Sequence, residues 1–85
     1  MLKIDAAGPS DGRITIRLEG RMLGPWVEEL RRTCEAHLGE GRALTLDFSG
    51  VSFVDREGVA LLRTLRQRQA RLANCSAFLK ELLNA

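Results

Sequence analysis

The sequence predicts an α+β domain in which a mixed β-sheet is covered by helices on one face. Three observations support this fold class. Several short segments alternate apolar and polar residues, as strands do when one face of the sheet meets water. Two longer segments carry apolar residues at helical spacing. Within 85 residues the order is β-β-α-β-α-(β)-α, which suits a single domain spanning residues 1–85 with a small core.

The first half of the chain predicts a hairpin followed by a helix. Segments 2–6 and 13–19 alternate like half-buried strands, and the turn-forming stretch 7–12 between them is short enough for antiparallel pairing. Gly24-Pro25 then opens a helix that two further glycines end. The apolar stripe of this helix consists of Trp26, Val27, Leu30, Cys34 and Leu38.

The second half predicts a strand, a longer helix and a short tail. Segment 44–48 alternates like a strand, and 50–54 is expected to lead from it into the helix. On a helical wheel one side gathers Gly58, Leu61, Leu62, Leu65, Gln69 and Leu72. The opposite side gathers Arg56, Arg63, Arg66 and Arg71, with Val59 among them and no evident core for it to enter. Segment 73–75 is expected to form a brief strand, and Ser76 to cap a last short helix.

Composition narrows the function classes. Hydrophobic residues make up 45% and charged residues 28%, values typical of a globular protein. The longest apolar run, Val59–Leu62, is far shorter than the roughly 20 residues of a membrane span, so we expect no direct membrane insertion. Residues 1–5 alternate like a strand and do not resemble a signal peptide, which predicts a cytoplasmic protein. The formal charge of +2 is too small to predict nucleic-acid binding.

The residues that carry chemistry form no recognisable catalytic or metal-binding pattern. Cys34 and Cys75 match neither a zinc signature nor a CxxC motif, and two reduced thiols are favoured over a disulfide. His37 has no ligand-type residues at suitable spacing, so no metal is expected. There is no nucleophile–base pair and no phosphate-binding loop. The sequence therefore predicts no catalytic residues, no cofactor and no enzymatic activity.

The junction 52–58 is the most informative stretch, because three charged side chains occupy consecutive positions at a predicted helix N-terminus. Asp55 is expected to be the N-cap, and Glu57 lies in the first turn, where a negative charge favours the helix dipole. Gly58 falls on the buried side of the wheel, where the lack of a Cβ permits close packing. Such a junction presents oriented backbone N–H groups and charge at the surface.

Segment 44–65 resembles the STAS domain, a family that includes bacterial anti-sigma-factor antagonists and the STAS domains of anion transporters and lipid-transport systems. Segment 46–55 reads LDFSGVSFVD and is similar to the family's "DLSGV-x-F-x-D" strand end. Gly58-Val59 matches the end of the "D-S-S-G-L" helix start, and 18–22, LEGRM, resembles the "L-x-G-x-L" segment. The tail from Leu72 is short for the family's last strand and helix.

The chain departs from the antagonists at the residue that a cognate kinase usually phosphorylates, the serine or threonine directly before the motif glycine. Glu57 occupies that position and Arg56 the one before it, and neither side chain accepts a phosphate. Ser52 is a less favoured acceptor, since a turn residue that bonds its own backbone is the simpler interpretation. Two interpretations of Glu57 remain: the switch is lost and binding is constitutive, or the carboxylate holds the domain in a phosphorylated-like, non-binding state.

The resemblance implies a non-enzymatic protein–protein interaction module that takes part in partner switching and transcription regulation in bacteria. Its partner would be an anti-sigma factor or a related kinase-like regulator. The alternative is an accessory subunit of a lipid or anion transport system, in which case the partner is a transporter subunit. The residues expected to bind the partner are Ser52, Asp55, Arg56, Glu57, Val59 and Arg63, together with Arg21 and Gly24 of a neighbouring loop. For several of them a structural role is the simpler interpretation: capping for Asp55 and a solvated face for the arginines.

Overall fold

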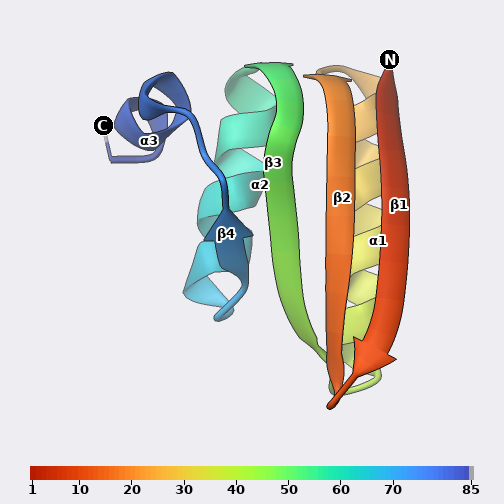
Figure 1. The fold of residues 1–85 in the computed structure, drawn as a ribbon. Helices are drawn as coiled ribbons and strands as arrows, with labels where there is room; N and C mark the ends of the chain where they lie inside the picture. The colour runs from red at the N-terminus through yellow and green to blue at the C-terminus, as the bar shows by residue number, and fades with distance from the viewer. Residues whose placement is uncertain (85) are drawn as a thin grey trace.

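The computed structural model, which describes residues 1–84, contains a four-stranded sheet and three helices (Figure 1). In chain order the elements are β1 (Leu2–Ser10), β2 (Arg13–Met22), α1 (Pro25–Gly39), β3 (Ala43–Val54), α2 (Arg56–Gln67), β4 (Arg71–Ala73) and α3 (Ala77–Asn84). The strand order is β1-β2-β3-β4, with β1 antiparallel to β2 and the other two pairings parallel. Helices α1 and α2 lie behind the sheet on the same face (Figure 1), so the predicted α+β class is confirmed.

The core forms between this face of the sheet and the two long helices. The alternation of β2 and β3 places Ile14, Ile16, Leu18, Leu44, Leu46 and Phe48 inward, each at most 3% exposed. From the helices, Leu30, Cys34, Leu62 and Leu65 complete the contact, whereas Trp26 and Leu38 are only half-buried at its margin. Burial of this apolar area is the main favourable term in folding. No helix within residues 1–84 is both long and apolar enough to cross a bilayer.

Strand β1 is longer than the sequence predicted. The segment 7–12 was expected to be a loop, but β1 continues to Ser10 and only Asp11-Gly12 form the turn. A register shift between Ala7 and Ser10 accommodates the Gly8-Pro9 pair. Because β1 is an edge strand, the proline's missing N–H costs no ladder hydrogen bond to a further strand. The turn-forming residues Gly8 and Pro9 therefore lie in an irregular end of strand β1 and not in a loop.

Strand β3 also extends further than predicted, through the segment 50–54 that was expected to lead as a loop into the helix. Two register shifts against β2 maintain the pairing while breaking the regular alternation of side chains. Gly50 is needed at this point, because a Cβ there would lie 2.8 Å from Glu19 Cγ and 3.0 Å from the Leu18 carbonyl oxygen. As a result, Asp55 alone separates β3 from α2.

Helix α2 is shorter than predicted. It ends at Gln67, and Gln69 has a φ of +73°, which stops the helix before the wheel's last two apolar-side positions. The brief strand lies at Arg71–Ala73, two residues earlier than expected, and pairs with residues 45–47 in the first half of β3. Ser76 caps α3 as predicted, since its Oγ accepts a hydrogen bond from the Leu79 N–H at 3.1 Å.

Candidate functional site

Asp55 joins the start of α2 to the loop that precedes α1. Its Oδ1 accepts a hydrogen bond from the Gly58 N–H at 2.7 Å, which is the predicted N-cap contact. Its Oδ2 accepts from the Gly24 N–H at 3.1 Å, and its own N–H donates to the Met22 carbonyl at 3.0 Å. One carboxylate thus holds two chain segments that the sequence separates by 31 residues. Arg21, which was expected in a loop, is the last residue but one of β2, and only Leu23 and Gly24 lie between β2 and α1. We call residues 52–59 together with segment 21–24 the docking corner.

Gly58 allows the first turn of α2 to sit directly on the strand ends. A Cβ at this position would lie 2.7 Å from Val54 Cγ1 and 3.2 Å from Met22 Sδ, both closer than ordinary van der Waals contact. Gly58 is buried, so the predicted close approach of helix and strand is confirmed. This packing fixes the direction in which the two preceding side chains leave the helix.

Arg56 and Glu57 are exposed in that first turn. Within residues 1–84 neither side chain takes part in an ion pair or a hydrogen bond. A carboxylate here stabilises the helix N-terminus by about 0.3–1 kcal/mol through the dipole. The local benefit to the helix is therefore small, and both charges are available to a partner.

The ends of β2 and β3 bring two further predicted residues to the edge of the corner. The Arg21 guanidinium lies over the Phe53 ring, 5.5 Å from its centroid. Ser52 is exposed, and its hydroxyl donates to the Gly20 carbonyl oxygen at 3.3 Å. The expectation that Ser52 bonds its own turn backbone was wrong, because β3 extends through it and places it beside β2.

A hollow of about 430 Å³ adjoins the corner. It is lined by Val54, Asp55, Arg56, Val59, Ala60, Arg63 and Leu82, which include four of the predicted partner-binding residues. Val59 is half-buried and packs against the core, so the expectation that it had no core to enter was wrong. An apolar floor with charged margins is the pattern of an anchor site in protein–protein interfaces.

Helix α3 supplies one wall of this hollow, which the sequence did not indicate. Arg63 donates to the Leu82 carbonyl at 2.8 Å and Arg66 to the Leu83 carbonyl at 3.1 Å. These guanidinium groups satisfy carbonyls in the last turn of α3 and place positive charge at its C-terminus. The arginine face of α2, predicted to be solvated or to meet a partner, is therefore partly used within the chain. Arg71 does not belong to it, since it lies on β4.

A second, smaller hollow of about 30 Å³ lies between the end of β3 and α3. Its lining shares Val54 and Leu82 with the first hollow and includes Ser52. Three aromatic side chains line it: the buried Phe48, and two exposed ones, Phe53 at 42% exposure and Phe78 at 65%. Exposed aromatic residues beside a polar rim are typical of interaction surfaces. The sequence does not indicate that Phe53 and Phe78 line one hollow, because this depends on how α3 packs against the end of β3.

Shifted pKa values occur at two thiols and one carboxylate, which lie in α1, between β4 and α3, and in β3. Burial raises the pKa of the Cys34 thiol in α1 to about 12, and burial also raises the pKa of the half-buried Cys75 thiol. The pKa of Asp47 is lowered by hydrogen bonds from the Asn74 side chain and the Ser49 N–H. Within residues 1–84 no group of three or more His, Cys, Asp or Glu side chains is arranged to hold a metal ion.

Comparison with known proteins agrees with this geometry. The family model described as "Mlab, STAS domain" matches residues 6–85. A solved structure of the anti-sigma factor antagonist SpoIIAA in its unphosphorylated form is similar in fold, with a TM-score of 0.76 and 23% identity over 96% of this chain and 82% of that chain. Comparison with curated proteins gave no significant match. The chain therefore belongs to the STAS domain family.

Proposed function

We propose that this STAS domain is a non-enzymatic interaction module that binds a protein partner constitutively through the docking corner. The observation that carries the proposal is Glu57, which stands exposed at the position of the usual phospho-acceptor, one residue before the buried Gly58. By resemblance to the antagonists, the partner is an anti-sigma factor or a related kinase-like regulator. The corner is preorganised by Asp55, which lowers the entropic cost of binding.

Constitutive binding is favoured over permanent imitation of phosphoserine for an electrostatic reason. A carboxylate carries one negative charge and two acceptor oxygens, whereas a phosphate carries roughly −1.5 to −2 and three acceptor oxygens. The neighbouring Arg56 offsets part of the field of Glu57, and both are exposed to screening by solvent and salt. Glu57 is therefore a weak substitute for a phosphate group.

The test is capture of the partner from native cytosol with wild-type protein and two variants. Ala60 is exposed and lines the 430 Å³ hollow, so Ala60→Asp places a negative charge there. Ala36→Asp is the matched control, because it makes the same substitution at an exposed position of α1 away from the hollow. We expect Ala60→Asp to lose an anti-sigma-type or kinase-like partner that Ala36→Asp and wild type retain. Equal capture by Ala60→Asp and wild type would show that the corner is not the docking surface.

The role of Glu57 is tested by the Glu57→Ser variant incubated with the cognate kinase. We expect the variant to incorporate phosphate and then release the partner, while the wild type incorporates none and stays bound. Phosphate found on Ser52 of the wild-type protein would contradict the loss of the switch. A Glu57→Ser variant that binds more tightly than wild type before phosphorylation would favour the phosphorylated-like, non-binding interpretation.

A second candidate function is an accessory subunit of a lipid or anion transport system. The substitution of Glu57 and Arg56 for phospho-acceptors favours it, because a permanent subunit has no need of reversible release. Capture from detergent-solubilised membranes distinguishes the two candidates. A membrane ATPase complex that is lost in Ala60→Asp supports the transport role, whereas a soluble regulator lost in the same variant supports the antagonist role.

A further inference from the structure

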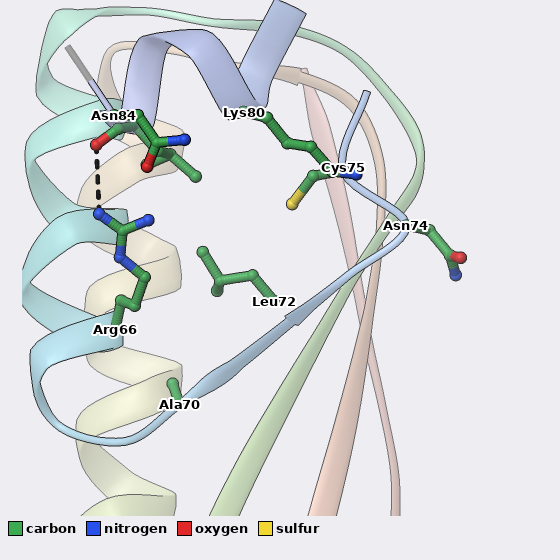
Figure 2. A pocket seen from close by; sticks show the side chains of 8 residues that line it. Arg66, Ala70, Leu72, Asn74, Cys75, Lys80 and Asn84 are labelled. Carbon is green, nitrogen blue, oxygen red and sulfur yellow. Dashed lines mark hydrogen bonds between the residues drawn. The ribbon is translucent and has the colours of Figure 1, made fainter. Parts of the chain in front are cut away.

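A cavity of about 680 Å³ lies between the end of α2, β4 and α3 (Figure 2). Its lining consists of Arg66, Ala70, Leu72, Asn74, Cys75, Lys80, Leu83 and Asn84. None of these residues lines the hollow at the docking corner. Cavities of small-molecule sites are typically about 300–1,000 Å³, so the size is suited to a small ligand.

Among the residues that the structure describes, both charged side chains that line this cavity are positive. Arg66 and Lys80 are its two charged lining residues, and neither of the two asparagines that line it carries a charge. Arg66 uses one N–H for the Leu83 carbonyl and retains four others. Within residues 1–84, Lys80 takes part in no ion pair and no side-chain hydrogen bond. Arg66 therefore has one of its N–H groups occupied by a hydrogen bond within the chain, whereas the ammonium of Lys80 can bind a ligand with all of its N–H groups.

The inner surface between these cations is apolar. Ala70 and Leu83 are buried and Leu72 is half-buried, and all three line the cavity. Figure 2 shows the Cys75 sulfur beside Leu72 and turned into the cavity, with Lys80 running alongside. Asn74 points away, and its amide instead donates to Asp47 Oδ1 at 3.0 Å (Figure 2). An apolar floor next to unpaired positive charge suits a ligand that has both an alkyl chain and an anionic group.

We propose that this cavity binds a small anionic amphiphile, a carboxylate on a short aliphatic chain. The carboxylate pairs with Lys80 beside Cys75, and the chain covers Leu72 and Ala70. Arg66 lies on the opposite side of this apolar floor and adds positive potential to the cavity (Figure 2). The proposal is independent of the docking corner and of the identity of the protein partner.

Cys75 provides a reporter for the test, because its thiol lines the cavity and Cys34 does not compete. Cys34 is fully buried and its pKa is raised to about 12, so alkylation of the folded protein reports on Cys75. The probe is decanoate below its micelle concentration, with iodoacetamide alkylation followed by mass spectrometry. When the decanoate concentration is ten times its Kd, about one tenth of the protein has no decanoate bound, so the alkylation rate of Cys75 should fall about tenfold.

Charge specificity is tested with matched probes and matched variants. Decyltrimethylammonium carries the same chain with a positive charge, and acetate carries the carboxylate without the chain; neither should protect Cys75. The Lys80→Gln variant should weaken decanoate about fivefold, while Lys3→Gln, at the chain's other lysine on β1, should not. Because Lys80 lowers the pKa of Cys75, each variant is compared with its own rate without ligand.

Three outcomes would overturn the proposal. These are unchanged Cys75 alkylation at saturating decanoate concentrations, equal protection by decyltrimethylammonium, and undiminished affinity in Lys80→Gln. Amide chemical shifts give a second reading, since decanoate should move the signals of 70–75 and 80–84 and leave those of 52–59 in place. Shifts confined to 52–59 would place the ligand at the docking corner and would also refute the assignment.

Discussion

Replacing Asp55 tests whether one carboxylate organises the docking corner. Asp55→Ala removes the N-cap contact to Gly58, which is worth about 1 kcal/mol, and the acceptor for the Gly24 N–H, worth about 0.5–1.5 kcal/mol. The expected loss in the free energy of unfolding is therefore about 2 kcal/mol. For a domain of this size that corresponds to a fall in Tm of about 8–16 °C.

The Asp55→Asn variant separates the two contacts. Asparagine caps a helix about as well as aspartate, so the bond to Gly58 is retained. Its second side-chain atom is an amide donor, which cannot accept from the Gly24 N–H. We expect Asp55→Asn to lose about 0.5–1.5 kcal/mol, an intermediate value that reports on the link between the corner's two segments.

Urea denaturation followed by circular dichroism measures these differences, provided that the m-value is unchanged. Asp5→Ala is the matched control, because Asp5 is an exposed carboxylate whose ion pair with Lys3 spans 3.7 Å and is worth at most about 1 kcal/mol. Equal stabilities of Asp55→Asn and wild type would refute the contribution of the Gly24 contact. A loss below about 0.5 kcal/mol in Asp55→Ala would refute the capping argument as well.

Three further changes have definite expected outcomes. Gly58→Ala should lower the free energy of unfolding in urea by about 1–2 kcal/mol, because overlap with Val54 outweighs the roughly 1 kcal/mol gain in helix propensity. Asn74→Ala should raise the pKa of Asp47 toward 3.8 in a carboxylate NMR titration, because it removes the hydrogen bond that lowers this pKa most. In the wild type the lowered pKa stabilises the folded state above pH 3.8, and this stabilisation is lost as the pH falls through the pKa that Asp47 has in the folded protein. The raised pKa of Cys34 stabilises the fold below pH 9.0 and is lost between pH 9.0 and about 12, so Cys34→Ala should flatten the alkaline decline in stability measured by denaturation at pH 9–11.

The regular parts of this fold could be predicted because their side chains follow a period. The segments 14–18 and 44–48 alternate without interruption, and both are buried strands. The end of β3 could not be predicted in the same way, because two bulges remove the alternation that identifies a strand. The end of α2 was not predicted, because it depends on a positive φ at Gln69, and the presence of a glutamine does not predict that conformation.

In the candidate site, too, the features that depend on local sequence were predicted, and the contacts between distant segments were not. Asp55 as N-cap and Gly58 as a close-packing residue follow from local rules, and both were predicted. The bond from Gly24 to Asp55 spans 31 residues, and the contacts of Arg63 and Arg66 with α3 span 19 and 17 residues. Such long-range pairings depend on how the elements pack. A helical wheel records which side of a helix is charged, but not which other helix lies against it.

The pairing of α2 arginines with α3 carbonyls affects how charge-scanning data on this domain would be interpreted. Neutralising Arg63 or Arg66 removes a hydrogen bond to a carbonyl of α3, so weaker partner capture by such variants combines a loss of charge with a loss of stability. Arg56 is exposed and, within residues 1–84, takes part in no hydrogen bond or ion pair, so its substitution breaks no such contact of the fold. Substitution of Arg56 is therefore the first choice for measuring the charge dependence of partner binding, and variants of Arg63 and Arg66 serve as stability controls.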